Sequence, residues 1–186
     1  MDKETNPFAY SLMMTGLYMG IAMCISDLFF FLSGNAFSDW SNIVTLGILV
    51  VGINMGIRYF RDEVIGGIIS FSRGWFFGIG MSFYAAFVYA FFVYIYIHFI
   101  DMSLMDIFIA TEKEALLASG YTNEEIETLI ISRGNEKLFT PYGVAIVQIF
   151  LINFYGVAIA LVASLFNHCC NRLKRVFRYL KISERK

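Results

Sequence analysis

The amino-acid sequence predicts an all-α, polytopic membrane protein with four transmembrane helices in a single domain, residues 1–186. Two observations lead to this fold class. Of the 186 residues, 58% are apolar and 18% are aromatic, whereas about 45–50% of a soluble domain is apolar. Four apolar stretches are also long enough to cross a bilayer, which takes roughly 20 residues in a helix.

The predicted spans contain very few ionisable residues. The first contains Asp27 and has no clear signal-peptide cleavage site, so we interpret it as a retained span. The third has His98 near its end, and the fourth has no charge. The three cysteines follow no disulfide or metal-binding pattern, so no metal is expected. The spans cover about residues 9–32, 40–57, 75–100 and 144–166.

Lysine and arginine residues are distributed unevenly around these spans, and this bias predicts the orientation. Of the 14 basic residues, 11 lie before the first span, between the second and third, or after the fourth. Both termini are therefore expected in the cytoplasm and residues 101–139 on the other side, as in a multi-pass protein of a bacterial inner membrane. We expect no nucleic-acid binding.

Residues 101–139 are predicted to form an extracytoplasmic helical hairpin. The sequences "SLMD" (103–106) and "TNEE" (122–125) both fit a capping box. Gly120 and Gly134 stand where helices end in a left-handed residue. The hairpin would pack over the outer mouth of the bundle or onto a partner, and a solvated, structural hairpin is the alternative. Its second helix has a short apolar stripe of Ile126, Leu129 and Ile130.

Basic residues on the cytoplasmic side are predicted to contact the headgroups of anionic lipids. The tail, residues 167–186, has the pattern of a basic amphipathic helix that lies on the inner leaflet. Each basic residue near that surface contributes about 1 kcal/mol. Binding of a nucleic acid or a protein partner by the tail is the alternative. The residues assigned to lipid headgroups are Arg58, Arg61, Arg73, Arg172, Lys174, Arg175 and Arg178.

Small residues spaced four apart predict the seams between helices, because helices in lipid associate through close approach of their backbones. All four spans have such a motif, which favours a compact bundle within one chain or between copies. A homo-oligomer or a larger membrane complex is therefore expected, with the third span at its centre. The predicted seam residues are Gly16, Gly20, Gly52, Gly56, Gly74, Gly78, Ser82, Ala86, Gly156 and Ala160.

The third span has a second face that is rich in aromatic residues. Such a face either lines a pocket for a flat ligand or packs against helices and lipid. We favour packing and expect no cofactor, since the spans contain no lysine for a Schiff base and only one histidine. The residues of this face are Phe77, Tyr84, Phe87, Phe91, Tyr94 and His98.

Asp27 is the strongest functional candidate, because an ionisable residue inside a span is costly to bury. Helical periodicity places it on the side of Gly16 and Gly20, facing a neighbouring helix. At a comparable depth lie Tyr94, His98 and Gln148, which we group with Asp27 as a candidate intramembrane polar cluster. The cluster is either a proton or cation site or a set of hydrogen bonds between helices. We favour hydrogen bonds, since the cluster is off-centre and no internal repeat is evident.

No catalytic motif of the serine hydrolase, zinc protease or phosphate-loop type is present. The charged stretch "GIRYFRDEVIGGIISFSRGW" (56–75) lacks the spacing and lysine of a phosphate loop, and we interpret it as a structured turn. The sequence thus favours a non-enzymatic accessory, assembly or scaffold subunit. The alternative is a transporter or channel for protons or small solutes that works as an oligomer around Asp27.

"GIRYFRDE" followed by "GGIISFSRG" at the start of an aromatic span resembles a family of small inner-membrane proteins of Bacteroidota, catalogued as domain of unknown function 4199. The outer segment "GYTNEEIETLI" is similar to one in the same family. The resemblance implies four helices and an inner-membrane location, and it implies no activity.

Overall fold

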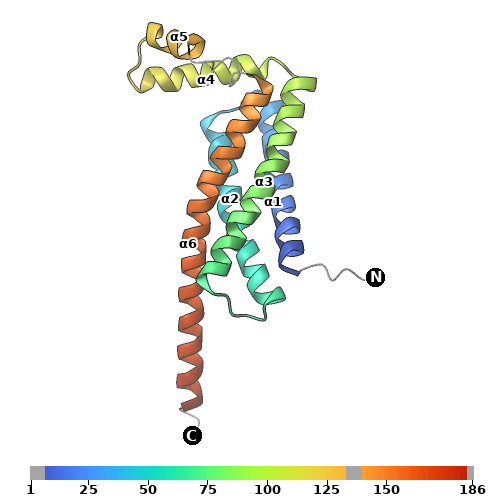
Figure 1. The fold of residues 1–186 in the computed structure, drawn as a ribbon, viewed down its shortest axis with the longest axis vertical. Coiled ribbons are helices and arrows are strands. Elements are labelled where there is room, and N and C mark those ends of the chain that lie inside the picture. The colour runs from blue at the N-terminus through green and yellow to red at the C-terminus, as the bar shows by residue number, and fades with distance from the viewer. Residues whose placement is uncertain (1–6, 133–139, 184–186) are drawn as a thin grey trace.

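The computed structural model describes residues 7–132 and 140–183, and for residues 127, 129–132 and 170–183 it describes the backbone alone. Every regular element in these ranges is helical. In chain order the elements are α1 (Pro7–Leu32), α2 (Asp39–Tyr59), the π-helical turn η1 (Phe60–Val64), α3 (Phe71–Ile95), the π-helical turn η2 (Tyr96–Ile100), α4 (Leu104–Ala118), α5 (Asn123–Ser132) and α6 (Pro141–Ser183) (Figure 1).

Four helical segments are long and apolar enough to cross a membrane, which confirms the predicted number of spans. They are longer than the predicted stretches, partly because η1 prolongs α2 and because α3 begins at Phe71, before the predicted start at Trp75. Both chain termini lie at one end of the bundle, here called the terminal end, and α4 and α5 lie at the other, here called the α4 end (Figure 1). The four segments are Pro7–Leu32, Asp39–Val64, Phe71–Ile100 and Pro141–Cys169.

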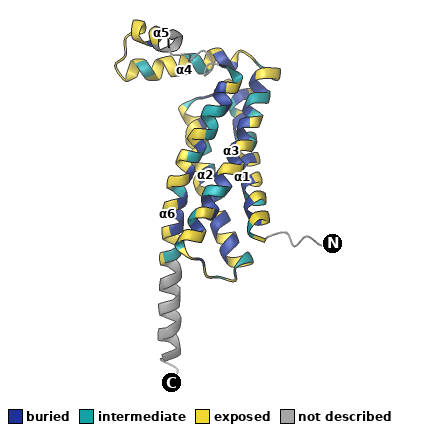
Figure 2. Ribbon diagram, viewed as in Figure 1, coloured by how far each residue is buried: buried dark blue, intermediate teal, exposed yellow. Residues whose placement is uncertain are grey.

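Helix α3 is the centre of the bundle, with α6 and α1 packed along it. Its side chains Phe77, Met81 and Val93 are fully buried in the core. Figure 2 shows buried residues on the inward faces of the spans and exposed residues on the outward faces. Many large exposed side chains of the spans are apolar or aromatic, which suits contact with lipid tails.

The turns at the two ends of α2 have clear local causes. Helix α2 begins after Ser38, whose hydroxyl accepts the N–H of Ser41 at 3.3 Å as an N-cap. After η1, Gly66 and Gly67 adopt φ values of 75° and 104°, which glycine adopts without strain. The N–H of Gly67 donates to the carbonyl of Arg61 at 2.7 Å. The glycine pair therefore reverses the chain, as expected of a structured turn.

The two predicted capping boxes have different outcomes. At the start of α5, the N–H of Thr122 donates to Glu125 Oε2 at 2.8 Å and the N–H of Glu125 donates to Thr122 Oγ1 at 3.4 Å, which confirms the second box. The first box is wrong. Ser103 caps no N–H group, because it is already helical (φ −65°, ψ −20°) and its hydroxyl donates to Asp101 Oδ1 at 2.6 Å.

Helix α4 lies across the end of the bundle, and its far end and α5 extend past the side of the bundle (Figure 1). Leu104 and Met105 bury the first turn of α4 in the core. Phe108 packs edge-on against Phe37 of the α1–α2 connection at 5.4 Å between ring centroids. Gly120, with φ of 93°, follows α4 as predicted. The predicted features at Leu129, Ile130 and Gly134 lie outside the described side chains.

Helix α6 is one helix of 43 residues that includes both the fourth span and the predicted tail. No separate tail helix begins near residue 167, since residues 167–183 contain no glycine or proline to end the span. The helix continues beyond the terminal end of the other spans (Figure 1). The predicted lipid contacts of Arg172, Lys174, Arg175 and Arg178 lie outside the described side chains.

Candidate functional site

Two clusters of polar side chains lie in the bundle, one toward each end, with Asp27 and Arg61 buried at their centres. The Asp27 cluster, toward the α4 end, consists of Asp27, Ser41, Thr45 and Tyr89. The Arg61 cluster, toward the terminal end, consists of Asn54, Arg61, Asp62 and Asn167. Both connect helices that are distant in sequence, and they differ in how charge is balanced.

The carboxylate of Asp27 is 2% exposed and accepts hydrogen bonds from three hydroxyl groups. Its Oδ1 accepts from Ser41 Oγ at 3.1 Å and from Thr45 Oγ1 at 3.2 Å. Its Oδ2 accepts from the hydroxyl of Tyr89. The cluster therefore joins α1, α2 and α3 through a single carboxylate, with both oxygens engaged.

Close packing of α1 on α3 places Asp27 beside Tyr89. A Cβ added to Gly20 would lie 2.8 Å from the Cβ of Val88 and 3.1 Å from the carbonyl oxygen of Ala85, so only glycine permits this approach. Asp27 is two turns after Gly20 and lies on the same face of α1. On α2, Ser41 and Thr45 are one turn apart and present their hydroxyls together.

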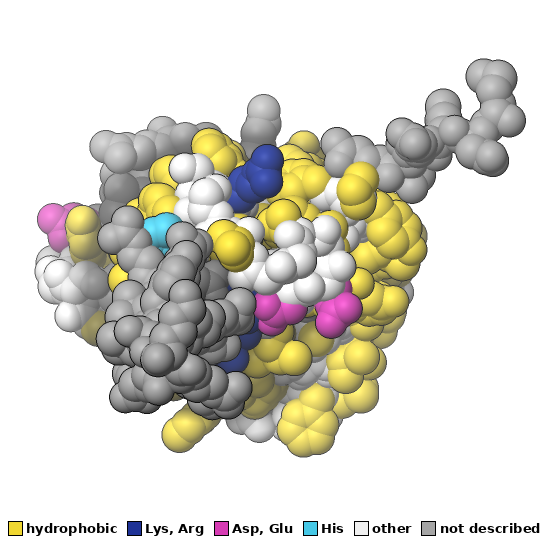
Figure 3. All heavy atoms as spheres, turned by 90° about the horizontal axis from the view of Figure 1, so that it is seen from below, with side chains coloured by type: hydrophobic (Ala, Val, Ile, Leu, Met, Phe, Trp, Pro, Cys, Tyr) yellow, Lys and Arg dark blue, Asp and Glu magenta, His cyan; other side chains and the backbone are white. Residues whose placement is uncertain are grey.

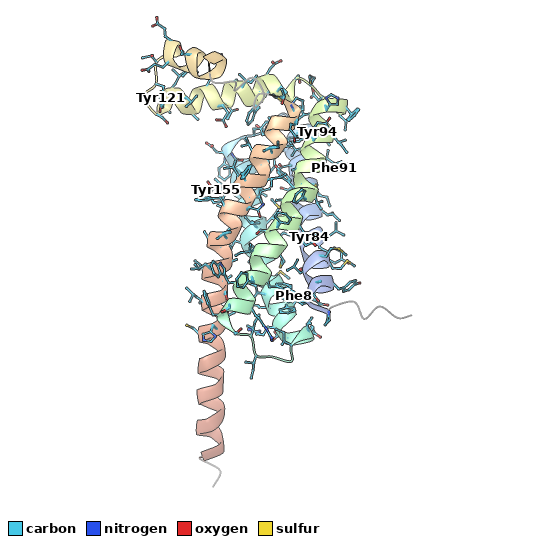
Figure 4. The ribbon with its side chains drawn as sticks, in the orientation of Figure 1. Phe8, Tyr84, Phe91, Tyr94, Tyr121 and Tyr155 are labelled. Carbon is cyan, nitrogen blue, oxygen red and sulfur yellow. The ribbon has the colours of Figure 1, made fainter. Side chains whose placement is uncertain are left out.

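A groove of about 320 Å³ leads toward the Asp27 cluster from the side of the bundle. Thr45 and Tyr89 line it, and both donate hydrogen bonds to Asp27. Further polar lining comes from Asn42 of α2 and Gln148 of α6. Tyr155, which also lines it, lies on the flank formed by α6, away from Tyr84 and Phe91 of α3 (Figure 4). The groove thus reaches two of the three residues whose hydroxyls bind Asp27, and neither Asp27 nor Ser41 lines it.

The partners of Asp27 differ from the predicted ones. His98 is exposed and stacks on Tyr94 at 5.4 Å between ring centroids, and neither is among the hydrogen-bond partners of Asp27. The prediction matched residues by depth and ignored their angle around the helix. Tyr94 is five residues after Tyr89, which turns it about 140° away from Asp27. Gln148, the third predicted member, lines the groove.

Sequence reasoning missed the three hydroxyl groups that bind Asp27. For α2 the sequence did contain an indication, because Ser41 and Thr45 have the four-residue spacing that places two hydroxyls on one helical face. Tyr89 gave no such signal, because the third span contains many aromatic residues. The choice among them depends on how α3 is rotated against α1.

In the Arg61 cluster, the guanidinium is 8% exposed and forms bonds in two directions. Its Nε and Nη2 donate to the two carboxylate oxygens of Asp62 at 2.6 and 2.7 Å. Its Nη1 donates to Asn167 Oδ1 at 3.2 Å. The amide of Asn167 in turn donates to Asn54 Oδ1 at 3.3 Å and to the carbonyl of Ala163 at 2.8 Å. The cluster ties η1 to α2 and α6.

This geometry corrects the prediction that Arg61 contacts lipid headgroups, because its guanidinium is buried against Asp62 and Asn167. Arg58 and Arg73 are exposed, as that role requires. Figure 3, which views the terminal end, shows charged side chains gathered toward the middle of a face that is otherwise mostly apolar.

The predicted seam glycines face neighbouring helices. An added Cβ at Gly16 would lie 2.9 Å from the carbonyl oxygen of Met81, and one at Gly78 would lie 2.6 Å from the Cβ of Ala160. At Gly52 it would lie 2.6 Å from Met19 Sδ. The remaining contacts are Gly56 with Met81, Gly74 with Ser164, and Gly156 with Ser82, and Ala86 is fully buried.

The aromatic face of α3 divides into an inner and an outer part. Phe77 is fully buried and stacks on Phe60 at 4.3 Å between ring centroids. Tyr84, Phe87 and Phe91 are exposed on the outer flank (Figure 4). This arrangement favours packing against the core and lipid over a ligand pocket on this face.

A second, larger groove of about 620 Å³ lies between α1 and α2 and is almost entirely apolar. Its lining includes Gly47, where an added Cβ would meet no atom within 4 Å. The described residues contain no group of three or more His, Cys, Asp or Glu side chains able to hold a metal ion.

Residues 15–168, which include both clusters, match a family described as protein of unknown function (DUF4199). The chain belongs to the DUF4199 family. This match confirms the resemblance seen in the turn between the second and third spans. No curated protein and no solved structure is detectably similar to the chain.

Proposed function

We propose that this DUF4199 protein is a non-enzymatic subunit of a bacterial inner membrane that assembles with other subunits, with both termini in the cytoplasm. The observation that supports the proposal is the lateral arm formed by α4 and α5 (Figure 1). The excess of basic residues on the terminal side of the spans supports the orientation.

The start of the arm packs against the bundle, whereas side chains farther along it are exposed. Leu104, Met105 and the Phe108–Phe37 contact hold the first turns of α4 on the bundle. Farther along, Leu117 and Tyr121 are exposed. These two side chains are available for contact with a partner. A neighbouring subunit in the same membrane is the partner that the direction of the arm favours.

The test is the mass of the assembly released from native membranes in mild detergent, measured by native mass spectrometry. We expect a defined complex larger than one chain, which the double variant Leu117→Glu, Tyr121→Glu dissociates. Glu114→Gln, an exposed change on the same helix, is the matched control and should leave the complex intact. A wild-type chain released only as a monomer would contradict the proposal.

A second candidate function is transport of protons or small solutes by an oligomer around Asp27. The groove lined by Thr45 and Tyr89, which both donate to Asp27, is the observation that favours it. The test is flux into proteoliposomes made with purified protein. Transport predicts a measurable flux that Asp27→Asn abolishes, and an equal flux in the two proteins would exclude this role.

A further inference from the structure

The charge of Asp27 is not balanced by any described basic side chain. Among the described residues, the ion pair is that of Arg61 with Asp62, at the other end of the bundle. The partners of Asp27 are three hydroxyl groups, which are dipoles without net charge. A buried carboxylate without a counter-charge is costly in a medium of low polarity. Asp27 therefore needs either a proton or a cation.

The donor set around Asp27 has the chemistry of a site for a hard cation. It consists only of oxygens, from one carboxylate and the hydroxyls of Ser41, Thr45 and Tyr89. Hard cations take oxygen ligands, whereas nitrogen and sulfur ligands select transition metals. A single carboxylate neutralises one positive charge, so a divalent ion would leave a net charge buried. The donor set therefore favours a monovalent ion.

The spacing of two pairs of these oxygens suits a small ion, whereas the hydroxyl of Tyr89 lies closer to Oδ2 and must move outward to join it. Two ligands about 2.4 Å from a hard cation and at right angles to each other lie about 3.4 Å apart. The hydroxyls of Ser41 and Thr45 lie 3.1 and 3.2 Å from Oδ1 of Asp27. With small movements, these oxygens can therefore exchange their hydrogen bonds to one another for contacts with a shared ion. A larger ion would need them farther apart.

We infer that the Asp27 cluster binds one monovalent cation of the size of Na⁺, held by the carboxylate of Asp27 and the hydroxyls of Ser41, Thr45 and Tyr89. The groove supplies the path, because two of these ligands line it. Along the same groove, the side-chain oxygens of Asn42 and Gln148 offer further places for a partly hydrated ion.

One other titratable side chain lies close to the site. Cys24, one turn before Asp27 on α1, is half-buried, and its thiol faces the carbonyl of Val88 at 4.0 Å. It lies on the α3 side of α1 and is not among the oxygens of the proposed site. The inference concerns only binding and needs neither flux nor a partner, so it can fail or succeed independently of both proposed functions.

The experiment measures the thermal unfolding midpoint of purified full-length protein in detergent. NaCl is titrated against choline chloride at constant ionic strength, with KCl as a second series. We expect the midpoint to rise with Na⁺ and to saturate, as linkage requires of a ligand that binds the folded state. Choline should have no effect, and K⁺ should need a higher concentration for the same rise.

Three variants locate the response. Asp27→Asn should abolish the specific effect of Na⁺. Ser41→Ala, a small change that the fold should tolerate if Asp27→Asn does not fold, should raise the half-saturating Na⁺ concentration by about tenfold, as loss of one site contact does in metal sites. Ser164→Ala removes a buried hydroxyl that donates to the carbonyl of Phe71 elsewhere in the bundle, and it should keep the wild-type response.

Three outcomes would overturn the inference. The first is a midpoint that responds equally to NaCl and choline chloride. The second is a Na⁺ response that persists unchanged in both Asp27→Asn and Ser41→Ala, which would place the ion elsewhere. The third is a midpoint that depends on pH and never on Na⁺ at any pH tested, which would show that the carboxylate takes only a proton.

Discussion

The Asp27 and Arg61 clusters solve the burial of charge in opposite ways. In the Arg61 cluster a buried guanidinium contacts the exposed carboxylate of Asp62 and also donates to Asn167, which in turn donates to Asn54. In the Asp27 cluster one carboxylate is surrounded by hydroxyls. A cluster whose charges compensate each other is not stabilised further by binding an ion. A cluster with an uncompensated charge is stabilised by binding one. The comparison therefore assigns a structural role to Arg61 and a binding role to Asp27.

The settings of the two clusters agree with these roles. Asn167 is buried, and its amide is bonded on both sides, so the Arg61 cluster fixes the point where α6 leaves the bundle. The Asp27 cluster instead lies beside a mostly apolar groove whose polar lining includes Thr45, Tyr89 and Gln148. The predictions below test the difference in order of decreasing effect.

The largest effect is expected for Arg61→Ala, at about 3 kcal/mol of unfolding free energy. The change leaves the buried Oδ1 of Asn167 without this charged donor, while Asp62, whose side chain is 51% exposed, stays hydrated. Unfolding in detergent by titration with a denaturing detergent measures it. The matched control is Arg58→Ala, an exposed arginine three residues earlier, which should change stability by less than about 0.5 kcal/mol. Equal losses of unfolding free energy in the two variants would contradict a structural role for Arg61.

Gly20→Ala should destabilise the bundle by about 2 kcal/mol, because the added methyl overlaps Val88 and the carbonyl of Ala85. It should also weaken the Na⁺ response, since it moves Asp27 away from Tyr89. Gly47→Ala is the control, because its added Cβ meets only open space. If the two variants had the same stability and the same Na⁺ response, close packing of α1 on α3 would not be what forms the site.

Tyr89→Phe should cost about 1 kcal/mol, the usual contribution of one hydrogen bond, because it removes the donor to Asp27 Oδ2. Tyr84→Phe, on the exposed flank of the same helix, should be neutral in the same denaturation assay. A neutral Tyr89→Phe would mean that the hydroxyl of Tyr89 does not hold the carboxylate.

The smallest effect concerns a carboxylate outside both clusters. The pKa of Glu125 is lowered because its carboxylate accepts hydrogen bonds from the N–H and hydroxyl of Thr122. A depressed pKa stabilises the start of α5 above the ordinary pKa of glutamate, and this contribution is lost as the pH falls through the lowered value. Amide hydrogen exchange of α5 should therefore speed up relative to its intrinsic rate on acidification.

Glu125→Gln provides the control for this prediction. The neutral amide cannot titrate, so the intrinsic-rate-corrected exchange of α5 should no longer depend on pH in the acidic range. If the wild-type protein and the variant behave alike, the capping box of Thr122 and Glu125 does not depend on ionisation. Because Glu125 is fully exposed, we expect this effect to be smaller than the effects of the substitutions in the two clusters.

Much of the architecture followed from local features of the sequence. The four spans, the glycines at the helix seams, the turn at Gly66 and Gly67, and the second capping box all depend on residues within a few turns of each other. Asp27 could be singled out, and its direction toward a neighbouring helix could be predicted, because helical periodicity relates it to Gly16 and Gly20.

The partners of Asp27 and the burial of Arg61 could not be predicted in this way. Ser41, Thr45 and Tyr89 are 14, 18 and 62 positions from Asp27, and Asn167 is 106 positions from Arg61. Which of many polar or aromatic residues meet across a seam depends on the rotation and offset of whole helices. The packing of side chains along the entire bundle sets those quantities.

The sequence by itself determined that the chain forms four apolar helices with a costly carboxylate in the first, because hydrophobicity and helical period are properties of consecutive residues. Only the tertiary structure decided that three hydroxyls surround this carboxylate and that Arg61, near the other end of the bundle, forms an ion pair with Asp62. Electrostatic balance is a property of groups brought together in space, so it appears only when the helices have packed.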